Sequence, residues 1–163
     1  LNMVQRLDEG MQSLAEVIKK TTGKDITNYP GAGAAGGMGG GLLAFFNAEL
    51  KPGTELLLKA IDFSEKIKGA DLIITGEGKA DRQTAMGKVP YGILKEAQKE
   101  HIPVIVLAGS IENLPELNKA GFKGIFSIAP GPITLEKAME PEFAKENITR
   151  LVSQLYSVIT SFG

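Results

Sequence analysis

The chain has 163 residues, of which 43% are hydrophobic and 23% are charged. This composition is that of an ordinary globular protein with room for one sizeable core. The net charge of -1 lacks the basic excess that is typical of proteins that bind nucleic acids or anionic membranes.

The absence of Cys excludes disulfides, thiol nucleophiles and Cys-ligated zinc, and a single His argues against a His-rich metal site. Any metal would therefore be bound by oxygen atoms. No apolar run approaches the roughly 18 residues of a membrane-spanning helix, and no signal peptide is visible. We expect a cytoplasmic protein whose partner is a small molecule, with no nucleic acid and no membrane.

The first 69 residues predict three helices separated by glycines. An amphipathic helix ends at Gly23, with apolar residues three or four apart at Met3, Leu7, Met11, Leu14 and Ile18. A glycine-rich run at 30–41 precedes the apolar residues 42–46, which we expect to form a short buried helix. A further helix is predicted over 52–68, closed by Gly69.

From residue 71 onward, strands alternate with helices. The predicted strands are 71–76, 103–109 and 124–129, and the predicted helices are 90–100, 113–120 and 141–161. Asn113 is expected to cap its helix in a capping-box arrangement, and the methionines and the apolar stripe of the last helix are expected in the core. Continuous apolar strands in this order predict an α/β fold, a parallel sheet with helices on both faces.

Three strands are few, because sheets usually have about 4 to 6. The chain also opens with Leu1, inside a helical pattern and without a capping residue. We therefore expect that the sheet is incomplete and that its remaining strands lie upstream.

In open parallel sheets, ligands bind beyond the carboxyl ends of the strands. The first strand is followed by residues 75–88, where the carboxylates of Glu77 and Asp81 alternate with the cations of Lys79 and Lys88. Phosphoryl transfer needs this mixture, because carboxylates hold Mg²⁺ or accept the hydroxyl proton while cations neutralise phosphate oxygens.

Lys88 comes directly before a predicted helix start, where backbone N–H groups also favour an anion. The alternative is a solvated charged loop in which Glu77 and Asp81 only cap turns.

Residues 31–36 match the letters of the dinucleotide fingerprint G-x-G-x-x-G, so a nicotinamide-dependent oxidoreductase is an alternative function. The context is unfavourable, because no apolar strand precedes the glycines. The glycines either allow close packing or let the backbone approach an anion. A noncatalytic interaction or oligomerisation domain is a third alternative, since an incomplete sheet exposes an edge.

Several long motifs resemble the bacterial glycerate kinase family, which phosphorylates D-glycerate with ATP. They are PGAGAAGGMG (30–39), AELKPG (48–53), DLIITGEGKAD (71–81), QT (83–84), GKVP (87–90) and APGP (129–132).

The resemblance implies a Rossmann-like domain that is interrupted by a second domain, with the substrate cleft between them. Residues 1–50 would be the end of the interrupting domain with its glycine-rich loop, and residues 51–163 the C-terminal part of the Rossmann-like domain. The family's Asp-Ser-Phe-Lys-Gly type loop is absent here, so the 163 residues are expected to be inactive alone.

On the matched positions, we expect Glu77 and Asp81 to bind Mg²⁺ or activate the hydroxyl, and Lys88 to neutralise phosphate charge. The cofactor-binding candidates are Gly33, Gly36, Gly37, Gly76, Gly78 and Lys79. The expected cofactors are ATP and Mg²⁺, the expected substrate is D-glycerate, the product is 2-phosphoglycerate or 3-phosphoglycerate, and a homo-oligomer is considered.

Overall fold

The computed structural model describes residues 2–161 and divides into two compact units. The first unit extends to Pro52 and the second begins at Gly53. Each has a hydrophobic core of its own.

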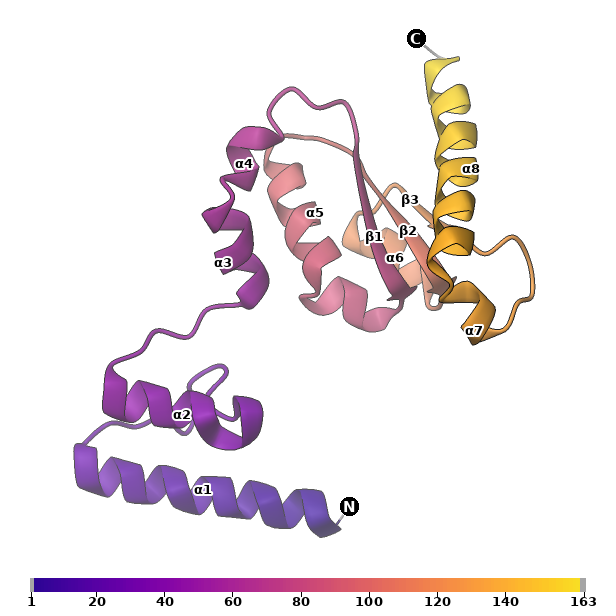
Figure 1. The fold of residues 1–163 in the computed structure, drawn as a ribbon. Helices are drawn as coiled ribbons and strands as arrows, with labels where there is room; N and C mark the ends of the chain where they lie inside the picture. Colours follow the sequence, from indigo (N-terminus) through magenta and orange to yellow (C-terminus); the bar gives the residue numbers. More distant parts are fainter. Residues whose placement is uncertain (1, 162–163) are drawn as a thin grey trace. The chain divides into compact units, whose positions relative to one another are not determined.

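The first unit consists of two helices that lie side by side, α1 (Asn2–Thr22) and α2 (Ala34–Phe46) (Figure 1). The predicted N-terminal helix is confirmed, and Gly23 ends it with a positive φ of 75°. The core of this unit is small, and its buried apolar residues are Ala15, Ile18, Ile26 and Ala44.

The glycine-rich run is partly helical. Ala35, Gly36 and Gly37 have positive φ angles, so the regular part of α2 follows Gly37. Further along, Gly39 packs so tightly that a Cβ atom there would lie 2.4 Å from the carbonyl oxygen of Gly31. Close packing is thus the requirement at Gly39. The helix expected over 42–46 is present, but only its Ala44 is buried, and Phe46 is 76% exposed.

The second unit is an α/β arrangement. Its elements in chain order are α3 (Gly53–Ala60), α4 (Phe63–Lys66), β1 (Ile73–Ala80), the 3₁₀ helix η1 (Arg82–Met86), α5 (Val89–Lys99), β2 (Val104–Ile111), α6 (Leu114–Ala120), β3 (Gly124–Ser127), α7 (Leu135–Ala138) and α8 (Pro141–Thr160).

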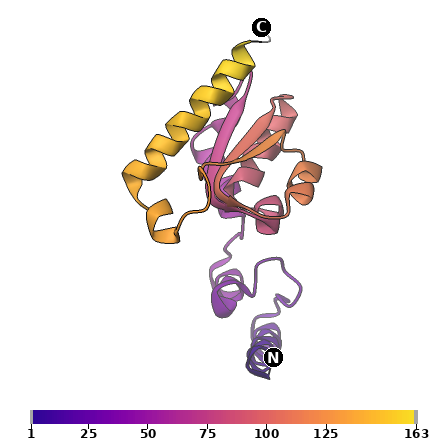
Figure 2. The same ribbon diagram turned by 90° about the vertical axis from the view of Figure 1, so that its right-hand side faces the viewer.

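The three predicted strands are confirmed, and they form a parallel sheet in the order β1-β2-β3. The central strand β2 is buried from Val104 to Ala108. Helices α5 and α6 lie on one face of this sheet and α8 lies on the other (Figure 2). The core on the α5 and α6 face includes Leu94 and Leu117, which are almost fully buried.

Three local expectations are wrong. The helix predicted over 52–68 breaks at Asp62, which has a φ of 51°. The first strand runs four residues further than expected, to Ala80, because its pairing with β2 continues to Ala80 and keeps the backbone extended. Asn113 adopts a φ of 53° and makes no capping bond with its side chain, so the capping box predicted there does not form.

The expected core role of the methionines and of the last helix is also wrong. Met3, Met38, Met86 and Met139 are each more than 60% exposed. Within α8, Ile148 and Ile159 are exposed, and Asn147 is the buried residue. Among the described residues, no helix combines the length and the apolar character needed to cross a bilayer.

The packing of α2 predicts opposite effects for two glycines in one helix. Gly39→Ala should destabilise the first unit by about 1–3 kcal/mol, because the new methyl group meets backbone that cannot rotate away. Gly41→Ala should stabilise it by about 1 kcal/mol, because open space surrounds Gly41 and Ala favours a helix. Hydrogen exchange of the α1 and α2 amides measures both changes. Equal protection in the two variants would contradict this packing.

Candidate active site

Three of the predicted site residues meet where β1 ends and α5 begins. Glu77 belongs to β1, Asp81 is the N-cap of η1, and Lys88 is the N-cap of α5. The Lys88 Nζ lies 3.2 Å from the Asp81 Oδ1 and 3.9 Å from the Glu77 Oε2. The side chain of Lys88 is 37% exposed, that of Asp81 21% and that of Glu77 12%. Solvent therefore reaches the cluster from the Lys88 side.

The local chain conformation that brings them together is a capping box at the start of η1. The Asp81 side chain accepts a hydrogen bond from the backbone N–H of Gln83, at 2.9 Å. The backbone N–H of Asp81 donates to the Thr84 Oγ1, at 3.0 Å. This reciprocal pairing stabilises a sharp turn directly after β1. The spacing Asp-x-x-Thr is its signal in the sequence.

Glu77 is fixed by the same threonine, because the Thr84 hydroxyl donates a hydrogen bond to the Glu77 Oε1. The sequence predicted Glu77 in the loop that follows the first strand. In the structure it lies in a strand that pairs with β2, opposite Ala108, so its backbone is held as well as its carboxylate.

Two opposing effects act on the pKa of Asp81. Desolvation raises this pKa, while the hydrogen bond from Lys88, the hydrogen bonds from backbone N–H groups and the charge of Lys88 lower it. The net result is a pKa below the ordinary value of an aspartate. Asp81 is therefore ionised at neutral pH, and Asp81, Glu77 and Lys88 together carry a formal charge of -1.

Lys79 does not join this cluster. Its Nζ lies 2.8 Å from the Glu112 Oε1, just beyond β2, and this hydrogen bond and the charge of Glu112 raise the pKa of Lys79. Glu112 was not among the candidates from sequence, because nothing in its neighbourhood along the chain indicates a cross-strand partner. A ligand that is to bind Lys79 has to compete with Glu112.

Gly76 and Gly78 lie in β1 itself. A Cβ atom at Gly109 of β2 would lie 2.8 Å from the carbonyl oxygen of Gly78, so the two strands approach closely at this point. The buried face of β1 also changes here. Thr75 and Ala80 are both buried although they are five residues apart, whereas residues on one face of a regular strand are an even number apart. Gly76 and Gly78 lie within the stretch where the buried face changes.

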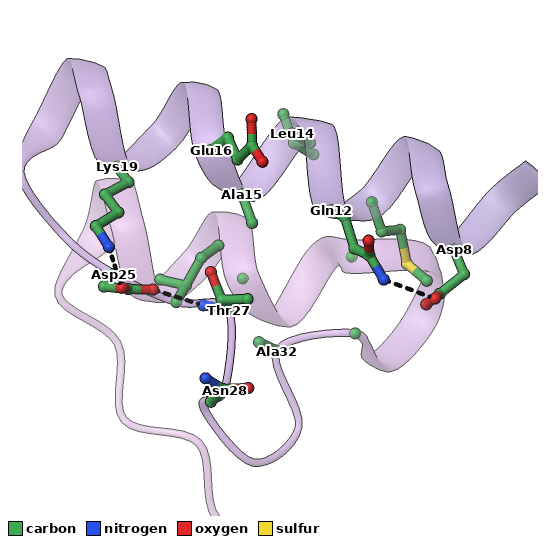
Figure 3. Close-up of a pocket in the computed structure, with 15 residues that line it drawn as sticks. Asp8, Gln12, Leu14, Ala15, Glu16, Lys19, Asp25, Thr27, Asn28 and Ala32 are labelled. Atoms are coloured by element: carbon green, nitrogen blue, oxygen red, sulfur yellow. Dashed lines mark hydrogen bonds and ion pairs between the residues drawn. The ribbon is translucent and has the colours of Figure 1, made fainter.

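The remaining candidates lie in the first unit. Gly33 and Gly37 line a pocket of about 560 Å³ between α1 and the segment that leads into α2 (Figure 3). Polar side chains in this pocket bond to one another, as in the ion pair of Lys19 with Asp25 at 2.5 Å. Gly36 does not line the pocket; its φ of 66° allows the turn before α2.

The geometry disfavours a dinucleotide fingerprint at Gly31–Gly36. That motif requires a strand directly before the glycines. Residues 2–52, as far as they are described, contain helices, turns and irregular segments but no strand. The glycine letters alone therefore do not support a nicotinamide site.

The donor set of the cluster fits Mg²⁺ better than zinc. Among residues 2–161, no group of three or more His, Cys, Asp or Glu side chains could enclose a metal. Mg²⁺ does not need such a group, since it is commonly held by one or two carboxylates together with the phosphates of a substrate. Glu77 and Asp81 supply two carboxylates at one edge of the sheet.

Comparison with known proteins places this geometry in a family. The model of the "Glycerate kinase family" matches residues 1–160. A protein of Bacillus cereus (strain ATCC 10987 / NRS 248) named glycerate kinase is 41% identical over 157 residues, which are 96% of this chain and 41% of that protein.

Two further relatives agree. A protein of Escherichia coli (strain K12) named glycerate 2-kinase is 42% identical over 149 residues, or 91% of this chain and 39% of that protein. A crystal structure of a protein from Salmonella typhimurium LT2, provisionally named glycerate kinase 2, superposes with a TM-score of 0.67 at 35% identity and covers 98% of this chain and 41% of that one. The chain thus spans about two fifths of the length of these relatives.

The ion pair predicts a specific change in the titration of Asp81. Lys88→Met should raise the pKa of Asp81, because desolvation then acts without the opposing cation. Carbon-13 NMR titration of the carboxyl group measures this pKa, with Lys99→Met, at the far end of α5, as the matched control that should leave it nearly unchanged.

The same lowered pKa fixes the sign of a pH dependence. Asp81 stabilises the fold above the pKa it has in the unfolded chain, and this contribution is lost as the pH falls through the lower folded-state pKa.

An unchanged pKa of Asp81 in the Lys88→Met variant would show that the two side chains do not interact in solution.

Proposed function

The chain belongs to the glycerate kinase family, and we propose that the complete protein containing it transfers the γ-phosphoryl group of ATP to D-glycerate. The observation that carries this proposal is the convergence of Glu77, Asp81 and Lys88 at the edge where β1 ends, because the mixture of carboxylates and a cation suits phosphoryl transfer. Since the chain spans about two fifths of its relatives, we propose that it is inactive alone.

In the proposed reaction, a hydroxyl oxygen of glycerate attacks the γ-phosphorus, and the bond from that phosphorus to the bridging oxygen breaks. ADP leaves with the electron pair of the broken bond. The hydroxyl proton passes to a carboxylate, either Glu77 or Asp81, and Lys88 neutralises charge on the phosphoryl oxygens. We propose the hydroxyl at position 2, giving 2-phosphoglycerate, in line with the name of the Escherichia coli relative; product analysis distinguishes 3-phosphoglycerate.

Glu77 and Asp81 are the residues that would hold Mg²⁺. When bound, the ion supplies positive charge that offsets the phosphates. The formal charge of -1 on the three side chains supports this assignment, because such a cluster would repel a free triphosphate. Lys88 then has two roles: it balances the carboxylates in the free protein and contacts the phosphates in the complex.

The glycine candidates are proposed to act through the backbone. Gly33 and Gly37 line the pocket of the first unit, where a missing side chain leaves the main chain accessible to substrate or nucleotide. Gly36 is proposed to allow the turn before the regular part of α2, and Gly76, Gly78 and Lys79 are proposed to bind the nucleotide.

We also propose a place for each unit in the family's architecture. Residues 1–50 would form the end of the interrupting domain, and residues 51–163 the C-terminal part of the Rossmann-like domain. The parallel order β1-β2-β3 with helices on both faces supports the second assignment.

Activity of the protein expressed from the complete reading frame tests the function. Asp81→Asn and Glu77→Gln should each lower kcat for ADP release with D-glycerate by about 10²–10⁴, the usual range for a group that acts in proton transfer. Glu100→Gln is the control: this residue ends α5 and precedes β2, at the opposite edge of the sheet. Wild-type rates in both site variants, or a wild type without glycerate-dependent turnover, would refute the proposal.

Substitution of Gly33 tests the glycine loop separately. Gly33→Ala should leave the thermal stability unchanged, because no atom lies within 4 Å of the new Cβ and the φ of Gly33 is -78°. It should weaken binding of substrate or nucleotide, because a methyl group then projects where the ligand approaches the backbone. Calorimetric titration with ATP and with D-glycerate measures this effect, with Gly41→Ala as control. Unaltered affinity for both ligands would remove Gly33 from the site.

A further inference from the structure

One side chain joins the Glu77 carboxylate to the backbone of Asp81, and the proposed chemistry does not use it. Thr84 is fully buried, and its hydroxyl makes two hydrogen bonds. We propose that Thr84 is a positioning residue that sets the orientation of Glu77 and ties it to the turn that holds Asp81. This inference rests on the proposed function, because it concerns the same site.

The hydrogen-bonding capacity of the hydroxyl explains the arrangement. A threonine hydroxyl has one proton to donate. Thr84 donates it to the Glu77 Oε1 and accepts the backbone N–H of Asp81 on the same oxygen. A single oxygen atom therefore connects the Glu77 carboxylate with the backbone at the start of η1.

The burial of Thr84 makes this orientation rigid. The residue lies in η1, which packs against both α5 and α6, and its backbone N–H donates to the carbonyl oxygen of Asp81 at 2.9 Å. The β-branched side chain has few rotamers, and close packing restricts them further. The hydroxyl is held in place by the interior of the second unit and not by solvent-exposed contacts.

The bond also divides the two oxygens of Glu77 between different tasks. The Oε1 faces Thr84, whereas the Oε2 faces the Nζ of Lys88 at 3.9 Å. That second distance is longer than a direct hydrogen bond. The Oε2 is therefore the oxygen of Glu77 that is available to a cation or to a substrate hydroxyl, and Thr84 keeps it directed there.

Removal of the hydroxyl at constant shape tests this role. In the protein from the complete reading frame, Thr84→Val should lower kcat by about 10²-fold, the loss typical of a catalytic group displaced by about 1 Å. The KM for D-glycerate should change little, because Thr84 does not contact substrate. Thr84→Ser retains the hydroxyl and should restore most of kcat. A rescue by serine separates the hydroxyl from the packing of the side chain.

A second comparison tests whether Thr84 acts through Glu77. In the background of Glu77→Gln, Thr84→Val should cause little further loss of kcat, because the carboxylate it orients is already gone. Fully multiplicative losses of kcat in the double variant would overturn the proposal. So would a kcat of Thr84→Val equal to that of wild type, or equal losses of kcat in Thr84→Ser and Thr84→Val. Thermal unfolding is measured for each variant, and Thr84→Ala replaces Thr84→Val in every comparison if the latter does not fold.

These outcomes are separable from those of the proposed function. If wild type shows no glycerate-dependent turnover, the kinase assignment fails. If wild type is active, Glu77→Gln is impaired and Thr84→Val is not, then only the positioning role of Thr84 fails.

Discussion

The ion pair between Lys88 and Asp81 joins two segments that the fold brings to one edge of the sheet. Asp81 belongs to the turn that follows β1, and Lys88 begins α5, the helix that leads the chain back to β2. The pairing keeps an anionic and a cationic group within 3.2 Å of each other at neutral pH, where Asp81 is ionised. The charge balance of the candidate site depends on it, because Lys88 lies within 4 Å of both carboxylates. Without Lys88, the cluster would carry a formal charge of -2, and the ion pair between this turn and the start of α5 would be lost.

The sequence predicted the elements with strong local signals. Hydrophobic periodicity predicted the alternation of strands and helices. The preference of Pro for the first helical turn predicted the helix that begins directly after Lys88. The boundaries of β1 were missed because glycines and charged residues have low strand propensity, whereas pairing with β2 favours an extended backbone through Ala80. Nonlocal pairing of this kind leaves no periodic signal in the sequence.

The candidate site was only partly predictable for the same reason. Glu77, Asp81 and Lys88 share one segment of the chain, so their proximity could be expected from sequence alone. Glu112 could not be expected, since it approaches Lys79 from beyond the neighbouring strand. The exposure of α8 and of several methionines was also not foreseen, because an amphipathic stripe shows which face is apolar and not what covers it.

A structure of the complete protein with Mg²⁺ and a nonhydrolysable ATP analogue tests the account most directly. The account predicts a cation about 2.0–2.1 Å from a carboxylate oxygen of Glu77 or Asp81, with the Nζ of Lys88 turned from Asp81 toward the terminal phosphate. A bound nucleotide whose phosphates lie remote from residues 77–88, with Lys88 still paired to Asp81, would contradict it.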